Sequence, residues 1–159
     1  MFKFLKKTDD TFKLFAPVNG KVINLENVPD KVFASKMMGE GVGFSFEGDT
    51  IYAPCDAKVA MVATTFHAVG LNLADGTELL IHIGLETVNL NGKGFTPLVK
   101  ANDEIKKGQP IMKVDLNLMK ENNLELYAAL VVLNHDSHPF KDIHTEDNIE
   151  VGDDLIQLD

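Results

Sequence analysis

The sequence lacks the features that mark secreted, membrane-spanning and nucleic-acid-binding proteins. Its single cysteine, Cys55, has no partner for an internal disulfide, which favours location in the reducing cytoplasm. No apolar run approaches the about 20 residues that span a bilayer. The 15 Lys and Arg are outnumbered by 24 Asp and Glu, and a net charge of −9 argues against nucleic-acid binding. This charge suits a basic protein partner instead.

The length and composition predict one folded domain. The chain has 159 residues, of which 45% are apolar and 25% charged, as in a globular protein with an ordinary core. Residues 1–7 are basic and aromatic, but neither an apolar signal segment nor a small-residue cleavage site follows them. We expect a flexible leader over residues 1–14, with at most peripheral membrane contact, and a single domain over residues 15–159.

Two internal repeats indicate a duplicated β-structure. Residues 16–23 (APVNGKVI) recur as residues 53–60 (APCDAKVA), and each copy has a proline and turn formers ahead of a strand. Residues 105–115 recur as residues 149–159, each copy a glycine-containing turn followed by a short alternating strand. Two copies are too few for a solenoid, so the repeats favour one duplicated domain.

Helix signals are few and short. Asp30 is placed to cap a turn that ends near Ala34, and Asp115 is placed to cap one that ends near Lys120. The rest of the chain alternates between apolar runs and turn residues. The sequence therefore predicts an all-β domain with a few short helical turns.

Two histidines fall on one predicted hairpin. Residues 75–76 (Asp-Gly) are typical of a two-residue hairpin loop between apolar strands. With that loop, His82 lies opposite Val69, and His67 becomes its diagonal neighbour on the same face, with Cα atoms about 7–8 Å apart. A three-residue loop would shift the register by one and separate the histidines.

The same register assigns other side chains to the two faces of the hairpin. Thr65 and Glu86 fall on the face of the histidines. Leu79, Ile81 and Ile83 fall on the opposite face, which we expect to pack on the core.

A pair of imidazoles beside a hydroxyl group suits group transfer. A neutral imidazole is nucleophilic at physiological pH, and a hydrogen bond to its other nitrogen fixes the tautomer. A second imidazole and a threonine hydroxyl can bind the oxygens of the transferred group. The residues alone leave two other interpretations open: ordinary hydrogen-bonded histidines, and two ligands of a zinc ion, for which the sequence shows no second ligand set.

The hairpin also carries a family resemblance. Residues 81–88 (IHIGLETV), preceded by residues 65–68 (TFHA), resemble the signature of the glucose-type enzyme IIA of the phosphoenolpyruvate-dependent sugar phosphotransferase system. Residues 28–34 and 39–43 resemble it in order and spacing, and the likeness extends from about residue 15 to the C-terminus. The resemblance implies an antiparallel β-sandwich or barrel with an internally duplicated motif.

The resemblance implies roles for three side chains. His82 would accept a phosphoryl group on Nε2 from the histidine-containing phosphocarrier protein and pass it to a cysteine on the enzyme IIB domain of a sugar permease. His67 would support the phosphohistidine, and Thr65 would hydrogen-bond to His67. The chain would then be a phosphotransferase component in sugar uptake.

The resemblance further implies a shallow site with an apolar rim for partner docking. The candidates for partner binding are Asp30, Val32, Phe33, Val69, Leu80 and Glu86. No cofactor is required, although zinc can bind between the two histidines in this family. We expect a cytoplasmic protein, either free-standing or excised from a larger permease.

Two other classes of protein share parts of this pattern. Residues 111–114 (IMKV) resemble the Met-Lys hairpin of biotinyl and lipoyl carrier domains, but the chain is longer than one such domain needs. A zinc hydrolase on a related duplicated scaffold would need further ligands near His67 and His82, which the sequence does not show.

Overall fold

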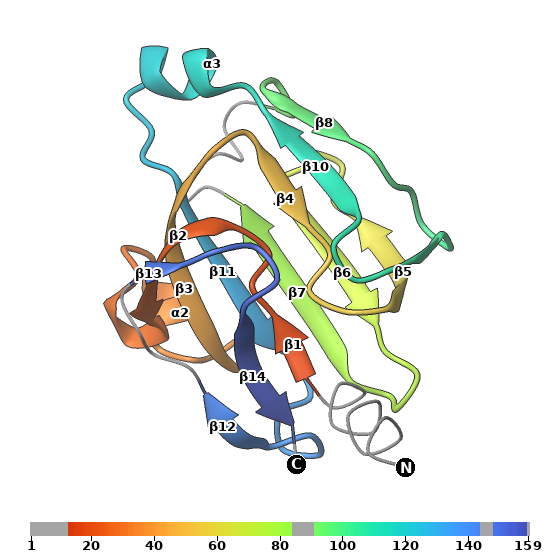
Figure 1. Ribbon diagram of the computed structural model, residues 1–159. Helices are drawn as coiled ribbons and strands as arrows, with labels where there is room; N and C mark the ends of the chain where they lie inside the picture. The colour runs from red at the N-terminus through yellow and green to blue at the C-terminus, as the bar shows by residue number, and fades with distance from the viewer. Residues whose placement is uncertain (1–12, 84–90, 144–147, 159) are drawn as a thin grey trace.

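The computed structural model describes residues 13–83, 91–143 and 148–158, in which antiparallel strands form three sheets (Figure 1). In spatial order, the eight-stranded sheet comprises β13 (Asn148–Ile149), β2 (Asn19–Asn24), β3 (Glu40–Glu47), β11 (Tyr127–Val132), β7 (Glu78–Ile83), β6 (Ala68–Asn72), β5 (Ala57–Val62) and β9 (Glu104–Ile105). The two three-stranded sheets comprise β1 (Lys13–Phe15), β14 (Asp154–Leu158) and β12 (Phe140–Ile143), and β4 (Thr50–Tyr52), β10 (Pro110–Val114) and β8 (Phe95–Pro97). The helical turns are η1 (Leu25–Asn27), α2 (Lys31–Ala34) and α3 (Leu116–Glu121).

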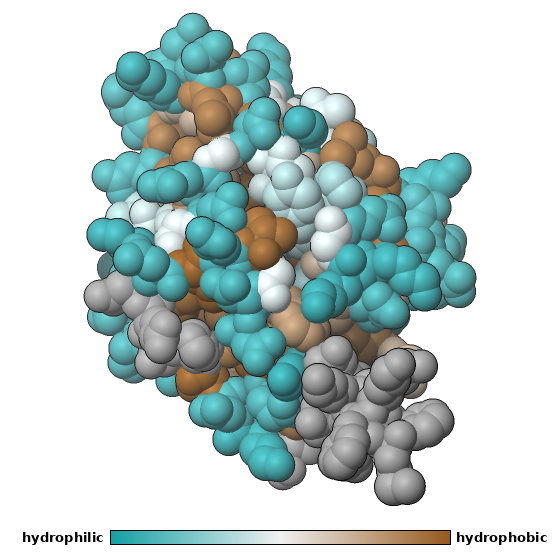
Figure 2. All heavy atoms as spheres, in the orientation of Figure 1, coloured by the Kyte–Doolittle hydropathy of each residue, from teal (hydrophilic) through white to brown (hydrophobic). Residues whose placement is uncertain are grey.

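The sheets form two layers around one core. Figure 1 shows the two small sheets in front of the large sheet, and Figure 2 shows that their outward face is mostly hydrophilic. Leu79, Ile81 and Ile83 of β7 are buried between the layers, as predicted, because alternate side chains of a strand point to opposite faces. Leu80 and His82 therefore point to the outer face of the large sheet. The predicted all-β sandwich is confirmed, and β13 and β9 do not pair to close a barrel among the described residues.

The sequence repeats have matching strand pairings. In the large sheet, Gly20 of β2 pairs with Ile149 of β13, and Ala57 of β5 pairs with Ile105 of β9. These pairs occupy equivalent positions in the two repeats. The structure therefore confirms the predicted duplication, because equivalent residues of the two repeats pair in the same way.

Backbone hydrogen bonds cross-link the two copies. Phe15 donates its N–H to the Pro54 carbonyl at 2.8 Å, and Tyr52 donates its N–H to the Pro17 carbonyl at 2.9 Å. Phe15 and Pro17 in one copy correspond to Tyr52 and Pro54 in the other. The exchange gives this part of the fold an approximate two-fold symmetry.

A matched pair of side chains stabilises the turns of the repeats. Asp56 Oδ1 accepts a bond from the Lys107 N–H at 2.9 Å, and Asn19 Oδ1 accepts the equivalent bond from the Val151 N–H at 2.8 Å. We expect Asp56→Ala and Asn19→Ala each to lower the free energy of unfolding by about 1 kcal/mol in urea titrations. Lys58→Ala, an exposed change on β5, should stay within about 0.5 kcal/mol. A loss in only one of the two variants would contradict their equivalence.

The two predicted helical turns are present with their caps. Asp30 accepts bonds from the backbone N–H groups of Val32 at 2.9 Å and Phe33 at 3.3 Å, which begins α2. Asp115 accepts a bond from the Leu118 N–H at 3.1 Å, which begins α3. The predictions for both caps are confirmed.

The predicted boundary of the leader at residue 14 is too late. Lys13 pairs with Gln157 in β1–β14, and the Leu14 side chain is fully buried in the core. A three-residue strand gives too short an alternation to be recognised in the sequence. Residues 1–12 lie outside the described residues.

Candidate functional site

The loop between β6 and β7 has three residues, and the predicted two-residue loop is wrong. Leu73 donates its N–H to the Thr77 carbonyl at 2.9 Å, which leaves residues 74–76 as the loop. The Asp75 carboxylate accepts the Thr77 N–H at 2.9 Å, and Gly76 has a φ of 92°. These features are typical of a turn followed by a left-handed residue, in which an Asp-Gly pair is equally favoured.

The shifted register moves Val69 away from the site. Val69 pairs with Ile81 on the core face and is fully buried, so its predicted place on the partner-binding rim is wrong. Ala68, and not Val69, pairs with His82. A small alanine side chain therefore lies beside the histidine on the outer face.

The two histidines nevertheless meet. His67 lies in the bend before β6, directly after Phe66, whose φ of 58° is in the left-handed region. Strand alternation does not hold across such a bend, so the register shift does not turn the His67 ring toward the core. The ring centroids of His67 and His82 are 4.9 Å apart, with an angle of 72° between the planes. The prediction that the rings meet is confirmed, although the register behind it is wrong.

Two contacts hold the His67 segment in place. The Thr65 hydroxyl is hydrogen-bonded to Nδ1 of His67, which fixes the ring orientation. The carbonyl of His67 accepts the Ile83 N–H at 2.7 Å, which ties the bend to the end of β7. Burial lowers the pKa of His67. The His67 ring is therefore fixed and neutral beside His82 at neutral pH.

His82 is a partly buried and neutral imidazole. Its ring packs against Phe33, with centroids 4.8 Å apart, and its Nδ1 is buried without a hydrogen-bond partner among the described residues. Burial, and next the nearby His67, lower the pKa of His82 to about 4, whereas the charge of Asp30 acts in the opposite direction. A neutral imidazole at pH 7 has a ring nitrogen with a free electron pair, as a nucleophile requires.

The lowered pKa makes a prediction about pH dependence. The folded pKa of His82 lies below the ordinary value of 6.5, so the unfolded chain binds this proton more readily. The lowered pKa of His82 adds up to about 3 kcal/mol to the free energy of unfolding. This contribution is present above pH 6.5 and is lost as the pH falls toward 4. We expect ¹⁵N resonances of His82 to titrate near pH 4, and His82→Gln to flatten the pH dependence of urea unfolding. A midpoint near 6.5 would contradict this assignment.

The histidines lie in an apolar hollow of ≈ 600 Å³ on the outer face of the large sheet. His82 lies between two small residues on the adjacent strands, Ala68 of β6 and Ala129 of β11, and Gly70 lies beside Leu80, so little side-chain bulk covers the histidine on the sheet. One wall is formed by α2, which packs beside the hollow with η1. The arrangement places the histidine pair in an open hollow on this face.

The hollow contains most of the predicted partner-binding residues. It is lined by Asp30, Val32, Phe33 and Leu80. Glu86 lies outside the described residues.

The hollow is also lined by three exposed, large apolar residues that were not among the predicted partner-binding residues: Met38, Met61 and Leu133. They come from three separate segments, so no local spacing links them to the histidines. Regular alternation along β5 would place Met61 on the core face with Val59; the shift in register between these two residues places Met61 on the outer face instead.

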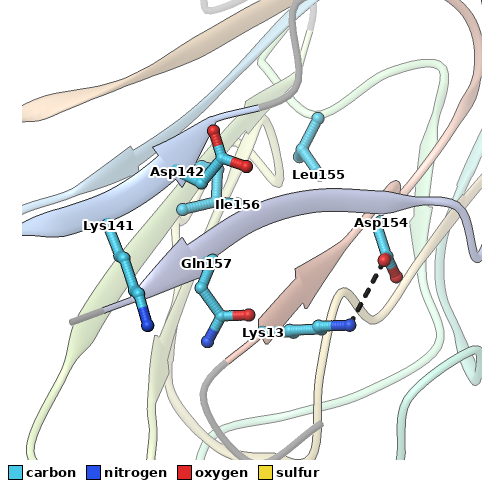
Figure 3. Close-up of a pocket in the computed structure, with 7 residues that line it drawn as sticks. All are labelled: Lys13, Lys141, Asp142, Asp154, Leu155, Ile156 and Gln157. Atoms are coloured by element: carbon cyan, nitrogen blue, oxygen red, sulfur yellow. Dashed lines mark hydrogen bonds and ion pairs between the residues drawn. The ribbon is translucent and has the colours of Figure 1, made fainter. Parts of the chain in front are cut away.

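A second hollow, of ≈ 580 Å³, lies on the small sheet of β1, β14 and β12 (Figure 3). The figure shows Lys13 directed toward Asp154, with which it forms an ion pair at 3.3 Å, and Lys141 near Gln157. The described residues that line it include no imidazole or thiol. This hollow therefore lacks the nucleophile that the histidine site provides.

Neither a metal centre nor a membrane span is formed by the described residues. His67 and His82 could offer two nitrogen ligands, but in this part of the chain no group of three or more His, Cys, Asp and Glu comes together. A zinc ion would take its remaining ligands from elsewhere, such as a bound partner. Within the same residues, no helix is long and apolar enough to cross a bilayer.

Comparison with known proteins gives the family. Residues 12–138 match the family model described as phosphoenolpyruvate-dependent sugar phosphotransferase system, EIIA 1. The chain belongs to this family. A glucose-specific EIIA component from Staphylococcus epidermidis is 42% identical over 151 residues, which cover 92% of this chain and 90% of that protein. The glucose permease IIA from Mycoplasma capricolum has the same fold, with a TM-score of 0.83 at 30% identity over 91% of this chain and 93% of that one.

Some relatives of the EIIA chain are much longer proteins. A glucoside-specific EIICBA component from Staphylococcus carnosus is 47% identical over 143 residues, which cover 90% of this chain but 20% of that protein. The chain thus spans about a fifth of the length of such relatives.

The family membership confirms the expected activity. As an EIIA component, the chain is a phosphoryl carrier in sugar uptake and therefore a transferase. The family membership excludes the two alternative functions considered from the sequence, a biotinyl or lipoyl carrier and a zinc hydrolase. In agreement, Met112 is buried and Lys113 lies within β10, with its Nζ 3.8 Å from Oδ2 of Asp49, instead of at the tip of a hairpin.

Proposed function

We propose that His82 accepts the phosphoryl group from the phosphorylated histidine-containing phosphocarrier protein and passes it to the cysteine of an enzyme IIB domain. The observation that carries this proposal is the neutral His82 ring in an apolar hollow, 4.9 Å from the ring of His67. The fusion of related EIIA segments into EIICBA components supports an enzyme IIB domain as the acceptor.

The transfer uses Nε2 of His82, because its Nδ1 is the buried nitrogen. The electron pair of Nε2 attacks phosphorus, the P–N bond of the donor breaks, and the donor imidazole takes back its electron pair. In the second step, the thiolate of the enzyme IIB cysteine attacks phosphorus, a P–S bond forms, and the P–N bond to His82 breaks. Neither step needs a cofactor, since positioning and charge stabilisation supply most of the rate enhancement.

His67 and Thr65 position the transferred group. Because Thr65 engages Nδ1 of His67, the Nε2 of His67 remains to donate a hydrogen bond to a phosphoryl oxygen. His67 thus stabilises the phosphohistidine without receiving the group. Thr65 acts through His67 and is a positioning residue.

The surroundings of the histidines suit successive docking of two partners. The same hollow must receive donor and acceptor in turn, and its apolar lining provides a surface that both can cover. Asp30 at the rim and the net charge of −9 favour a basic surface on the phosphocarrier protein. We further propose that the chain acts in the cytoplasm with a glucose-type permease. The permease is supported by relatives described as glucose-specific components and as a glucose permease IIA.

The proposal is tested by charging the protein in solution. The chain is incubated with phosphoenolpyruvate, enzyme I and the phosphocarrier protein, and its intact mass is measured. We expect the gain of one acid-labile phosphoryl group, which is lost again when an enzyme IIB domain of a glucose-type permease is added. A correctly folded chain that gains no phosphoryl group would contradict the proposal.

A further inference from the structure

The methionines of the described residues fall into two groups. Met112 and Met119 are in the core, with 0% and 2% of their surface exposed. Met37, Met38 and Met61 are exposed by 80%, 39% and 43%. We call these three the rim methionines: Met38 and Met61 line the hollow of the histidines, and Met37 lines an adjoining hollow.

Met61 folds over the sheet toward the hollow. It pairs with Gly70 of β6, which in turn pairs with Leu80 of β7. A Cβ atom on Gly70 would lie 3.0 Å from Cγ and 3.3 Å from Sδ of Met61, so the missing side chain makes room for the thioether. The Met61 sulfur is thereby held on the same face as Leu80 and His82.

Met37 and Met38 lie on another side of the histidine hollow. Met38 lines the histidine hollow, and both methionines line an adjoining hollow of ≈ 440 Å³. Leu133 borders the two hollows and is 41% exposed. The exposed methionine sulfurs of the described residues are therefore gathered on the face where partners must dock.

We propose that the rim methionines are a site of oxidative modification by hydrogen peroxide, which switches off docking at the histidine hollow. The thioether sulfur attacks one peroxide oxygen, the O–O bond breaks, a sulfoxide forms, and the other oxygen leaves as water. The sulfoxide is polar and chiral where the thioether was apolar and flexible. A partner would then have to bury an unpaired polar group, which weakens the complex. This inference rests on the proposed function of the hollow.

The cysteine of the chain does not compete for the oxidant. Cys55 is buried, and burial raises the pKa of its thiol to about 12, so the reactive thiolate is scarce at neutral pH. The core methionines Met112 and Met119 are shielded in the same way by burial. Mild peroxide should therefore modify the rim methionines first.

The test combines peptide mapping with transfer kinetics on the full chain. The folded protein is treated with hydrogen peroxide, and the oxygen gained at each methionine is mapped by mass spectrometry. We expect oxidation at Met37, Met38 and Met61 ahead of Met112 and Met119. The rate of phosphoryl uptake at low phosphocarrier concentration should fall about tenfold through a higher KM, and methionine sulfoxide reductase should restore it.

A matched variant separates rim oxidation from other damage. The triple variant Met37→Leu, Met38→Leu, Met61→Leu is compared only with its own rate before peroxide, and we expect that rate to be retained. An unchanged rate in fully rim-oxidised wild-type protein would overturn the inference, as would an equal loss in the triple variant. If the untreated chain takes up no phosphoryl group, the proposed function itself has failed, an outcome recognised before peroxide is added.

Discussion

Replacing His82 with alanine is expected to abolish phosphoryl uptake, with a rate loss of at least about 10⁴-fold. The ring supplies the nucleophile of the uptake step in our proposal, and neither Phe33 nor Ala68 beside it can replace its nitrogen. His67 lies 4.9 Å away by ring centroids, but in our proposal its Nδ1 is engaged by Thr65 and its Nε2 carries the proton that it donates, so neither nitrogen has a free electron pair. The rate is measured as acid-labile phosphate gained from the phosphorylated phosphocarrier protein.

The His82 variants need a control for folding and one for docking. His82→Gln keeps a polar side chain of similar length, and its circular dichroism and urea midpoint show whether the sheet is intact. Lys141→Ala changes the second hollow, which has no imidazole, and we expect its uptake rate to equal that of the unaltered chain. Uptake by a folded His82→Ala chain would show that another residue is the acceptor.

Replacing His67 with alanine is expected to have a different effect. His82 keeps its nucleophilic nitrogen and still becomes phosphorylated, but transfer to the enzyme IIB domain should slow by about 10²–10³-fold. The reason is the loss of the hydrogen-bond donor that stabilises the phosphoryl oxygens in our proposal. Single-turnover transfer from isolated phosphorylated protein measures this second step alone.

Thr65→Val provides the matched variant for His67. It keeps the shape of the side chain and removes the hydroxyl that is hydrogen-bonded to Nδ1 of His67. We expect transfer to the enzyme IIB domain to slow by about tenfold, with His82 still phosphorylated. A complete loss of phosphorylation in His67→Ala would reverse the roles that we assign to the two histidines.

The parts of the fold that were predicted from the sequence depend on short-range signals. Asp30 and Asp115 cap their helical turns because a carboxylate satisfies backbone N–H groups two or three residues away. The repeats predicted a duplicated structure, and the pairs Gly20–Ile149 and Ala57–Ile105 confirm it. In each case the interacting residues are marked by local or repeated patterns.

The register of the histidine hairpin was not predictable from the same signals. An Asp-Gly pair suits both a two-residue and a three-residue loop, and the Asp75 bond to the Thr77 N–H decides between them only in the folded chain. The wrong choice placed Val69 on the rim. His67 nevertheless meets His82, because the left-handed backbone of Phe66 interrupts the strand just before His67. Strand alternation does not predict such an interruption.

The composition of the hollow also depends on long-range packing. Met38, Met61 and Leu133 reach it from segments that are distant in sequence. Their meeting requires the order of strands in the large sheet, which pattern analysis of single segments does not provide. Family resemblance supplied the roles of the histidines, and the structure supplied their surroundings.

The atom that carries the phosphoryl group can be identified directly by ³¹P–¹⁵N correlation NMR of the ¹⁵N-labelled, phosphorylated chain. We expect a single phosphoramidate signal, coupled to Nε2 of His82, and an unphosphorylated His67. Coupling of phosphorus to Nδ1 of His82, or to either nitrogen of His67, would contradict the assignment of acceptor and supporting residue.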